Sequence, residues 1–459
     1  MIALQHIQKV FLIGIGGMGM SALARYFQAQ GCKVAGYDRS RSPLTEALEA
    51  SGMAVYDSPA IPAADWAADL VIYTPAIGRD HPVFVHYLNE GIPVYKRSEV
   101  LEEILKDMRC IAVAGSHGKT TISCMIAHLL HDSGLRAHAF LGGISANYGT
   151  NYLKGDQPLA VVEADEYDRS FLRLHPDVAV ITAMDSDHLD IYETQEQLQD
   201  AFRQFSHQIR PGGLLVHKTP AVPATGLGGD RKWSYSLTDP EARITARAIR
   251  PEEGGYHFTA VLPGQDHSPT LQLPMGGLHN VENALAAIAV GRDAGLSTAD
   301  IRAALASFKG VKRRFEYRLQ RADKVYIDDY AHHPEELRML LKGVRALFPQ
   351  AGLTLVFQPH LYSRTRDMAA AFAEVLQEAD RVILLPVYPA REAPIPGVDS
   401  GLIAGMLPPE KVQLCEKAEL LTVLTSDPHK VVVTAGAGDI GDMSAAIANA
   451  FNESAKSRS

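Results

Sequence analysis

Apolar runs alternate with amphipathic stretches along most of the chain. The run from Lys9 to Gly16 predicts a buried strand, because continuous apolar residues that end in glycines are typical of parallel sheets. Met18 to Gln30 has helical spacing, and Lys33 to Asp38 predicts the next strand. Further strands are expected at 69–76 and 93–96. Strands that alternate with helices predict an α/β domain with a mostly parallel sheet.

The same alternation restarts beyond residue 106. A strand at 110–114 is followed by a glycine loop and a helix at about 120–131. More strands are expected at 159–163, 178–183 and 214–217. Between 242 and 273 the runs become short, which predicts peripheral antiparallel strands. Helices are expected at about 280–293 and 298–309.

A third α/β pattern begins at Lys324. Its strands are expected at 325–328, 353–357, 381–385 and 431–434. We therefore predict a Rossmann-like domain at 1–106, a central P-loop ATPase-like domain with a mostly parallel sheet at 107–312, and a Rossmann-like domain at 313–459.

Composition narrows the class of protein. Of the 459 residues, 46% are hydrophobic and 21% are charged, which is ordinary for a soluble protein. The net charge of −9 disfavours a nucleic-acid partner, and the four cysteines are too scattered for a zinc or redox site. The chain has neither the pattern of a signal peptide nor an apolar run long enough to cross a bilayer. We expect a cytoplasmic protein with no membrane partner.

A glycine loop joins the first strand to the first helix. Its members are Gly14, Gly16, Gly17, Met18 and Gly19. Glycines let a phosphate approach the backbone, and the helix N-terminus offers free N–H groups. Asp38 ends the next strand, where an acidic residue can meet a ribose hydroxyl. The pattern predicts a nucleotide site and leaves a nicotinamide dinucleotide and another nucleotide both open.

A second glycine loop has stronger chemical meaning. It follows the strand that ends at Ala114 and consists of Gly115, Ser116, His117, Gly118, Lys119, Thr120 and Thr121. This G-K-T form between a strand and a helix predicts binding of a nucleoside triphosphate such as ATP. Lys119 would neutralise phosphates, and the Thr120 hydroxyl would bind Mg²⁺.

Further ligands for Mg²⁺ are expected where the following strands end. Glu163 ends one strand, and His188 follows another. The carboxyl ends of parallel strands meet at one edge of the sheet, so both side chains would face Thr120. Mg²⁺ prefers oxygen ligands and keeps several waters, and a carboxylate with one imidazole is acceptable.

These motifs resemble those of the Mur ligases, which build the peptide of bacterial peptidoglycan on a UDP-sugar. The resemblance rests on the second glycine loop, E-A-D-E at 163–166 and D-H-L-D at 187–190. It extends over essentially the whole chain, through R-R-F at 313–315 and D-D-Y-A-H-H-P at 328–334. It implies that the first domain binds a UDP-sugar, the second ATP and the third an amino acid.

The resemblance also implies a role for individual residues. Gly16 to Gly19 would face the diphosphate, Asp38 the uridine ribose, and His117 the sugar-acid carboxylate. The remaining expected contacts are Lys119 with phosphates; Thr120, Glu163 and His188 with Mg²⁺; Asn280 and Asn283 with adenine; Arg314 and Asp329 with ATP; and Tyr330, His360 and Arg364 with the amino acid. Arg313 is expected to be a solvated neighbour of Arg314.

Other stretches are similar to the branch of the family that adds L-alanine to UDP-N-acetylmuramate. They include F-Q-P-H at 357–360 and the run from Val387 to Gly397. Leu361 departs from the pattern, because this position is often basic in that branch. The absence of lysine between His188 and Lys218 fits the branch, whose members lack the modified lysine of their siblings.

The expected reaction forms an acyl phosphate from the sugar acid and ATP, and the amine of L-alanine then attacks it. His188, His332, His360 or water would take the amine proton. The alternative acceptor is the L-Ala-D-Glu-diaminopimelate tripeptide used by a recycling ligase.

Two other classes of protein fit the sequence less well. An oxidoreductase would leave the second glycine loop unexplained. The intact set of Lys119, Thr120, Glu163 and His188 argues against a non-catalytic sensor. We expect a monomer or a weak homodimer.

Overall fold

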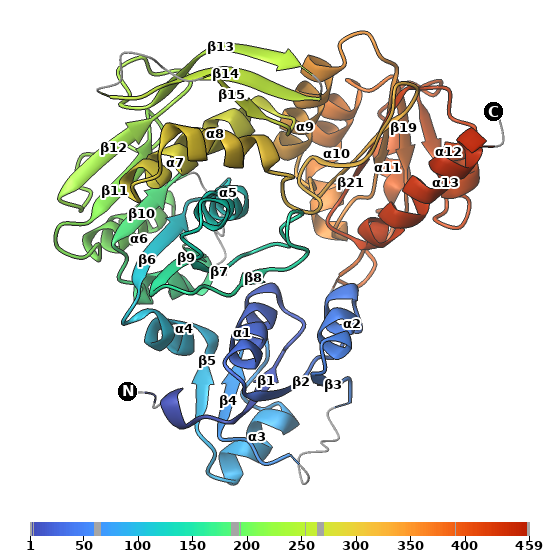
Figure 1. Ribbon diagram of the computed structural model, residues 1–459. Helices are drawn as coiled ribbons and strands as arrows, with labels where there is room; N and C mark the ends of the chain where they lie inside the picture. The colour runs from blue at the N-terminus through green and yellow to red at the C-terminus, as the bar shows by residue number, and fades with distance from the viewer. Residues whose placement is uncertain are drawn as a thin grey trace. The chain divides into compact units, whose positions relative to one another are not determined.

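The computed structural model describes residues 2, 4–58, 66–184, 192, 194–252, 254–263, 270–390 and 392–456. The chain forms two compact units (Figure 1). Unit 1 comprises Met1–Ala248, Phe258–Leu271 and Glu282–Phe308, and unit 2 comprises Ile249–His257, Gln272–Val281 and Lys309–Ser459. The predicted α/β class is confirmed, because both units contain mostly parallel sheets with helices between the strands.

The N-terminal sheet of unit 1 has five strands in the order β3-β2-β1-β4-β5. They are β1 (Lys9–Ile13), β2 (Lys33–Tyr37), β3 (Ala54–Tyr56), β4 (Leu70–Tyr73) and β5 (Val94–Lys96), and all pair in parallel. The helices between them are α1 (Met18–Ala29), α2 (Pro43–Ala50), α3 (Pro82–Asn89) and α4 (Arg97–Leu105). The central strand β1 buries four of its residues, so the glycine loop that follows it begins from a fixed point.

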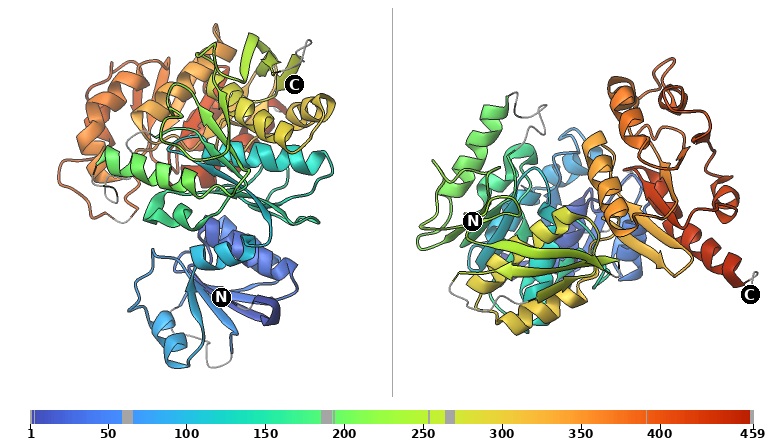
Figure 2. Two further views of the ribbon diagram at one scale, coloured as in Figure 1. Left: turned by 90° about the vertical axis from the view of Figure 1, so that its left-hand side faces the viewer. Right: turned by 90° about the horizontal axis from the view of Figure 1, so that it is seen from above.

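The second sheet of unit 1 has seven strands in the order β12-β11-β10-β6-β9-β7-β8. They are β6 (Arg109–Ala114), β7 (His138–Phe140), β8 (Tyr152–Leu153), β9 (Leu159–Glu163), β10 (Val178–Ile181), β11 (Leu214–Lys218) and β12 (Arg231–Tyr235). The pairs are parallel except β7 with β8. The left view of Figure 2 separates this sheet (cyan to green) from the N-terminal one (blue).

Helix α5 (Lys119–Asp132) is almost completely enclosed. All its residues from Thr120 to Leu130 are buried. An enclosed helix needs apolar side chains on every side, which explains the run of isoleucine, methionine, alanine and leucine after Thr121. The N-terminus of α5, which carries the second glycine loop, is therefore held rigidly at the end of β6.

The other helices of the central region are α6 (Gln195–His207), α7 (Leu278–Asp293) and α8 (Thr298–Ser307), with a short 3₁₀ segment η3 (Tyr167–Arg173). A separate three-stranded sheet has the order β13-β14-β15, formed by β13 (Thr245–Glu252), β14 (Gly255–Val261) and β15 (Thr270–Leu273). The short strands expected between 242 and 273 are therefore present in a sheet of their own.

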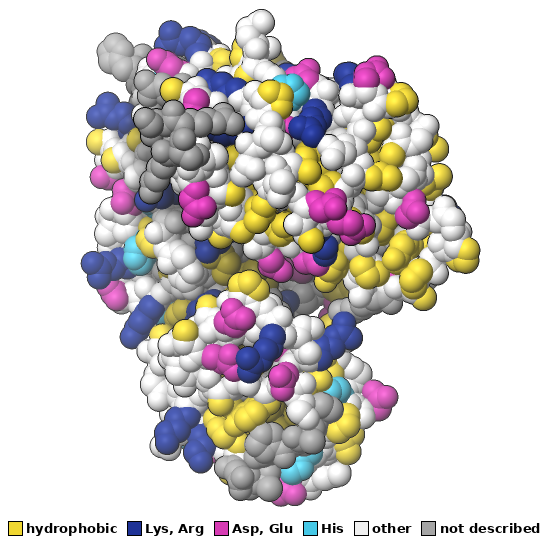
Figure 3. All heavy atoms as spheres, turned by 90° about the vertical axis from the view of Figure 1, so that its right-hand side faces the viewer, with side chains coloured by type: hydrophobic (Ala, Val, Ile, Leu, Met, Phe, Trp, Pro, Cys, Tyr) yellow, Lys and Arg dark blue, Asp and Glu magenta, His cyan; other side chains and the backbone are white. Residues whose placement is uncertain are grey.

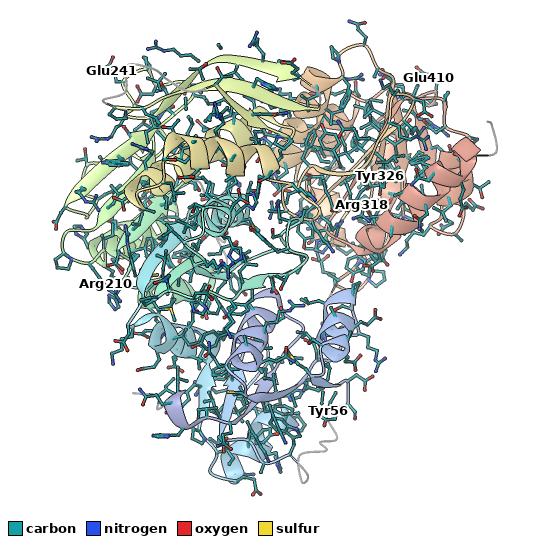
Figure 4. The ribbon with its side chains drawn as sticks, viewed as in Figure 1. Tyr56, Arg210, Glu241, Arg318, Tyr326 and Glu410 are labelled. Atoms are coloured by element: carbon teal, nitrogen blue, oxygen red, sulfur yellow. The ribbon has the colours of Figure 1, made fainter. Side chains whose placement is uncertain are left out.

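Unit 2 contains a six-stranded sheet in the order β16-β17-β21-β18-β19-β20. Its strands are β16 (Glu316–Gln320), β17 (Val325–Asp329), β18 (Leu353–Phe357), β19 (Arg381–Leu384), β20 (Val412–Leu414) and β21 (Val431–Ala435). Among the described strand pairs of this sheet, only the pair of the edge strand β16 with β17 is antiparallel. Tyr326 of β17, labelled in Figure 4, is buried and hydrogen-bonds Thr434 of β21 at 3.0 Å.

The helices of unit 2 are α9 (Pro334–Leu347), α10 (Tyr362–Leu376), α11 (Ser400–Ala404), α12 (Leu420–Thr425) and α13 (Ser444–Lys456), and η4 (Asp439–Met443) is a 3₁₀ turn. Within the described residues of both units, no helix is long and apolar enough to span a membrane. On the face in Figure 3, charged side chains of both signs are interspersed.

A buried ion cluster ties together the amino ends of three strands in unit 2. The Asp427 carboxylate accepts a hydrogen bond from Thr354 at 2.9 Å and pairs with Arg381 at 2.7 Å. The Lys324 ammonium lies 3.8 Å away and donates to two backbone carbonyls of the same loop. Since the Asp427 side chain has no exposed surface, its charge is balanced only by these neighbours.

Replacing Asp427 with Ala should strongly destabilise unit 2. The change leaves two partly buried cations without their carboxylate, and breaking such a pair costs roughly 3–5 kcal/mol. Denaturant unfolding of the full chain, followed by circular dichroism, would measure the loss. Asp367→Ala is the matched control, because Asp367 pairs with Arg366 on the surface, and exposed pairs contribute about 0–1 kcal/mol. Equal stability of the two variants would contradict a structural role for the cluster.

Candidate active site

The second glycine loop turns sharply between β6 and α5. Gly115 and Gly118 have φ angles of +126° and +83°, which side chains with a Cβ rarely adopt. A Cβ on Gly115 would also lie 2.2 Å from the hydroxyl oxygen of Thr182, at the end of β10. Two glycines are thus required by backbone conformation, and the first also by close packing.

Lys119, the first residue of α5, points back into this loop. Its ammonium donates to the carbonyl oxygen of Gly115 at 2.8 Å and to Oε1 of Glu166 at 2.7 Å. Glu166 is fully buried, and the burial raises the pKa of its carboxyl while the nearby Lys119 lowers it. The backbone carbonyl of Glu166 accepts a 2.6 Å hydrogen bond from the Tyr192 hydroxyl. Glu166 is thus the counter-ion of Lys119.

Sequence reasoning assigned no role to Glu166, although it belongs to the E-A-D-E motif. The signal was a third acidic residue, three positions after the Glu163 that ends the strand. A buried lysine needs a paired carboxylate, but the sequence alone does not tell which of the three acidic residues at 163–166 is buried.

Thr120 and Glu163 lie together, as the sequence predicted. The Thr120 hydroxyl donates to Oε1 of Glu163 at 3.1 Å, and the backbone N–H of Gly142 donates to Oε2 at 3.1 Å. A hydroxyl beside a carboxylate at a triphosphate loop provides the oxygen donors that Mg²⁺ prefers. His188, the third predicted ligand, lies outside the described residues.

The other residues of the loop contact neighbouring backbone. The N–H of Ser116 donates to the Ala183 carbonyl at 3.2 Å, and the His117 carbonyl accepts from the Thr182 hydroxyl. The side chain of His117 is exposed, and Thr121 is buried. The loop is therefore fixed by contacts with the end of β10.

The two predicted adenine ligands both lie near the start of α7. Asn283 packs beside the second glycine loop, since a Cβ on Gly118 would lie 2.9 Å from its Oδ1. Asn280 is buried, and its amide donates to the Gly276 carbonyl at 2.6 Å. Asn280 thus has a local structural role that the sequence did not suggest. Contact of either residue with adenine stays a prediction.

The first glycine loop is braced by Asp38. Gly14 has a φ of +88°, and the N–H of Gly16 donates to Oδ2 of Asp38 at 2.9 Å. The other carboxylate oxygen accepts from the N–H of Ser40 at 3.1 Å. Both oxygens of Asp38 therefore hold backbone, a role that the ribose interpretation did not include. Contact with a ribose stays a prediction.

The two halves of unit 1 share one cavity of about 340 Å³. Its wall includes Gly17, Met18 and Gly19 from the first glycine loop and Glu163 from the end of β9. The other charged lining residues are Lys96, Arg97, Asp165 and Asp168. The predicted sugar-nucleotide loop and the predicted metal ligand thus face the same space. Sequence analysis did not identify Lys96 and Arg97.

In unit 2, Asp329 organises the end of β17. Its Oδ2 accepts from the N–H of Phe315 at 2.6 Å, and its Oδ1 accepts from the N–H of Ala331 at 2.7 Å. Burial raises the pKa of this carboxyl. The neighbouring Arg314 is exposed. Their predicted contact with ATP is not tested by these interactions.

The expectation for Arg313 was wrong. Its guanidinium is partly buried, pairs with the buried Asp328 at 3.4 Å and lies 5.1 Å from the centre of the Tyr330 ring. Its carbonyl also accepts the N–H of Tyr330 at 2.7 Å. Burial raises the pKa of Asp328 to about 6, while Arg313 lowers it. No local pattern predicts this pairing, because it depends on the turn at 313–315, where Arg313 and Phe315 have positive φ angles.

The predicted amino-acid residues form part of a row of rings. Tyr330 contacts His332, His332 contacts His360, and His360 stacks on Tyr388 with ring centres 5.7 Å apart. Burial, with nearby His332 and Arg364, lowers the pKa of His360 to about 4. Among the described residues, His360 Nδ1 and Arg364 Nη1 are buried atoms without a hydrogen-bond partner. A neutral imidazole and a guanidinium are thus available to a small polar ligand.

The histidines at 332 and 333 differ in role. His333 precedes α9, and its ring nitrogen accepts from the N–H of Glu335 at 3.4 Å. His332 instead accompanies His360 in the row of rings, where burial lowers its pKa. Only His333 therefore serves as a helix cap through its side chain.

Models of known families match most of the chain. The Mur ligase family catalytic domain model matches residues 9–109, and the Mur ligase middle domain model matches 113–291. A model described as the Mur ligase glutamate ligase domain matches 313–438. These three matches follow one another without overlap.

Individual proteins agree with the family models. The chain is 46% identical to a UDP-N-acetylmuramate–L-alanine ligase of Cytophaga hutchinsonii, with 95% of each chain covered. It is 44% identical to one of Phocaeicola vulgatus, with 97% of this chain and 99% of the relative covered. The crystal structure of UDP-N-acetylmuramate-alanine ligase from Thermotoga maritima is similar with a TM-score of 0.84 at 30% identity, covering 98% of this chain and 100% of that one. The chain therefore belongs to the Mur ligase family.

Proposed function

We propose that the protein joins L-alanine to the carboxylate of UDP-N-acetylmuramate in peptidoglycan synthesis, using ATP and Mg²⁺. The observation that carries the proposal is the shared cavity, in which Glu163 of the triphosphate site faces the first glycine loop. A phosphoryl group and a sugar carboxylate must meet in such a space. The relatives at 41–46% identity, all named as L-alanine ligases, support this acceptor.

The fit to ATP and Mg²⁺ is supported by the residues around α5. Lys119 supplies a cation at a helix N-terminus, where free N–H groups favour phosphates. Thr120 and Glu163 supply a hydroxyl and a carboxylate 3.1 Å apart. When bound, ATP would supply the phosphoryl group, and Mg²⁺ would neutralise phosphate charge. His188 would be a further ligand of the metal.

In the first step, the sugar carboxylate attacks the γ-phosphorus, forming an acyl phosphate and releasing ADP. The step depends mainly on positioning and charge neutralisation. Lys119 would stabilise the negative charge, and Glu166 would hold the lysine in place. The first glycine loop would fix the diphosphate of the sugar nucleotide, with the carboxylate directed to the cavity beside Glu163.

In the second step, the amine attacks the acyl carbon, a tetrahedral intermediate forms, and inorganic phosphate leaves. The amine must lose a proton. His360 is kept neutral by its surroundings, so its ring can accept a hydrogen bond from the amino acid. Arg364 would bind the amino-acid carboxylate, and Tyr330 would border the same pocket.

The choice of acceptor is tested by phosphate release with ATP, Mg²⁺ and UDP-N-acetylmuramate. We expect clear preference for L-alanine over glycine, L-serine and the L-Ala-D-Glu-diaminopimelate tripeptide. Preference for the tripeptide would assign the chain to the recycling branch, while the acyl-phosphate chemistry would stand. Absence of release with every acceptor, from folded protein that binds the UDP-sugar, would refute the proposed catalytic centre.

The lysine and its counter-ion give a second prediction. Lys119→Met should lower kcat/KM for ATP by roughly 100-fold or more, because a preorganised donor to the phosphates is lost. Glu166→Gln should lower it by about 10-fold, because the lysine loses its charged partner. Steady-state kinetics over a range of ATP concentrations measure both. Lys154→Met is the control, since Lys154 lies on the surface and donates a hydrogen bond to the Ala29 carbonyl. Normal turnover by Lys119→Met would refute the assignment of Lys119 to the phosphates of ATP.

The lowered pKa of His360 predicts a pH effect on stability. Protonation is disfavoured in the folded protein, so the stability contributed by neutral His360 is lost as pH falls from about 6.5 toward about 4. His360→Gln cannot titrate, and its Tm should fall by about 2 °C less than that of the wild type between pH 7.5 and 5.0. Calorimetry at both pH values tests this, with the exposed His175→Gln as control. Identical falls in all three proteins would show that His360 does not titrate as described.

A further inference from the structure

Acidic side chains outnumber basic ones among the residues that line the shared cavity. Glu163, Asp165 and Asp168 line it, and only Lys96 and Arg97 among its lining residues are cations. A sugar nucleotide brings a diphosphate and a carboxylate into the same space. Like charges at short range repel strongly where water is excluded, so the cations decide where the substrate anions can lie.

The two cations differ in their partners. The ammonium of Lys96 forms a close ion pair with Asp168, so much of its charge is already neutralised. Arg97 senses the charges of Asp165, Asp168 and Glu163 only at longer range. Within the part of the chain that the structure describes, its guanidinium forms no hydrogen bond or ion pair. Arg97 is therefore the available cation of the cavity.

The side chain of Arg97 lies directly against the first glycine loop. A Cβ built on Gly19 would be 3.1 Å from both Cδ and Nη1 of Arg97, and 3.3 Å from Cζ. Gly19 is the second residue of α1 and has room for no larger side chain while the arginine keeps this position. The guanidinium is thus placed beside the free N–H groups of the first turn of α1.

Burial from water lowers the pKa of the Arg97 guanidinium, while the surrounding carboxylates raise it. Arginine nevertheless stays charged in proteins. A charged, partly desolvated guanidinium without a partner is unfavourable. A bound phosphate group could accept two parallel hydrogen bonds from the Arg97 guanidinium. The carboxylates of the protein interact with Arg97 only at longer range and form no such pair.

We propose that Arg97 binds the diphosphate of the UDP-sugar, together with the backbone N–H groups at the start of α1. This inference rests on the proposed function and adds a substrate-binding residue from α4. Gly19 is then needed for two reasons: the backbone must approach the phosphates, and Arg97 must lie on the loop. The diphosphate is favoured over the sugar carboxylate because the guanidinium lies beside the first glycine loop, where a Cβ built on Gly19 would be 3.1 Å from Nη1.

Calorimetric titration of the full-length protein with three probes tests the proposal. UDP and UDP-N-acetylglucosamine have the diphosphate but lack the lactyl carboxylate, which UDP-N-acetylmuramate has. Arg97→Met should weaken binding of all three by a similar factor, roughly 10- to 100-fold, the usual effect of removing charged hydrogen bonds. Arg97→Lys should retain part of the affinity, because it keeps the charge but loses the paired geometry.

Arg173→Met is the matched control. Arg173 lies nearby, but it pairs with Glu99 and Glu102 on the surface and does not line the cavity. We expect it to bind all three probes as the wild type does. The thermal unfolding of each variant checks that a loss of affinity does not come from misfolding.

A second variant tests the contact itself. Gly19→Ala should push the Arg97 side chain aside by a few tenths of an ångström and weaken UDP binding in the wild-type background. In the Arg97→Met background it should add little, because the displaced group is already absent. Fully additive losses would mean that Gly19 and Arg97 act separately.

The outcomes distinguish the alternatives. Loss of affinity for UDP-N-acetylmuramate alone would assign Arg97 to the sugar carboxylate and overturn the diphosphate contact. Unchanged binding of all three probes by Arg97→Met would remove Arg97 from the site. Failure of the wild-type protein to bind any of them would instead refute the proposed function on which the inference rests.

Discussion

The ion pair between Lys119 and the fully buried Glu166 is the constraint on which the second glycine loop and its neighbours depend. A lysine ammonium inside a protein requires a charged partner with good geometry. Glu166 provides it from the segment after β9, while Lys119 begins the helix after β6. The two strands are parallel neighbours, with Val113 opposite Glu163 in register. A slip of one residue would turn the side chains to the other face and separate the pair.

The same register fixes the rest of the proposed triphosphate site. Glu163 ends β9 at the level where the second glycine loop begins, so its carboxylate reaches the Thr120 hydroxyl. Gly142 follows β7 on the other side of β9, and a Cβ there would lie 2.2 Å from the Glu163 carboxylate. The glycine at 142 therefore leaves room for a carboxylate that would otherwise be pushed out of place. Hydrogen bonding and packing specify one position for Glu163.

Local patterns were sufficient to predict the main strands and the loops between them. Buried parallel strands such as β9 and β18 appear in the sequence as continuous apolar runs, and their bounds were predicted without error. The first strand was predicted too long, because it ends at Ile13 and the positive φ of Gly14 begins the turn. Edge strands such as β3 and β20 have only three residues each, too few for a clear pattern, and were not predicted.

The candidate site was predictable where a residue belongs to a local motif. Lys119, Thr120 and Glu163 follow from a loop and a strand end, and the structure brings them together. Arg97 and Glu166 could not be assigned in this way. Their roles depend on what surrounds them in space: Arg97 lies on Gly19 from a different helix, and Glu166 is selected by burial among neighbouring acids.

The amino-acid region of unit 2 depends on a strained residue. Leu361 has φ 72° and ψ 134°, and such a conformation in a non-glycine residue costs of order 1–3 kcal/mol. Three hydrogen bonds hold it: its N–H donates to Tyr388, and its carbonyl accepts from the N–H and hydroxyl of Thr365. The residue just before it, His360, stacks on Tyr388, whose carbonyl accepts the Leu361 N–H.

The identity of Leu361 then determines how a carboxylate would be recognised. A basic residue there would offer a second cation beside Arg364, and leucine does not. Arg364 has a buried nitrogen without a partner among the described residues, so it is the guanidinium left to bind an amino-acid carboxylate. Since a guanidinium can form two parallel hydrogen bonds with one carboxylate, a single arginine is chemically sufficient. Leucine at position 361 therefore removes one possible cation from the proposed amino-acid pocket and leaves recognition of a carboxylate to Arg364.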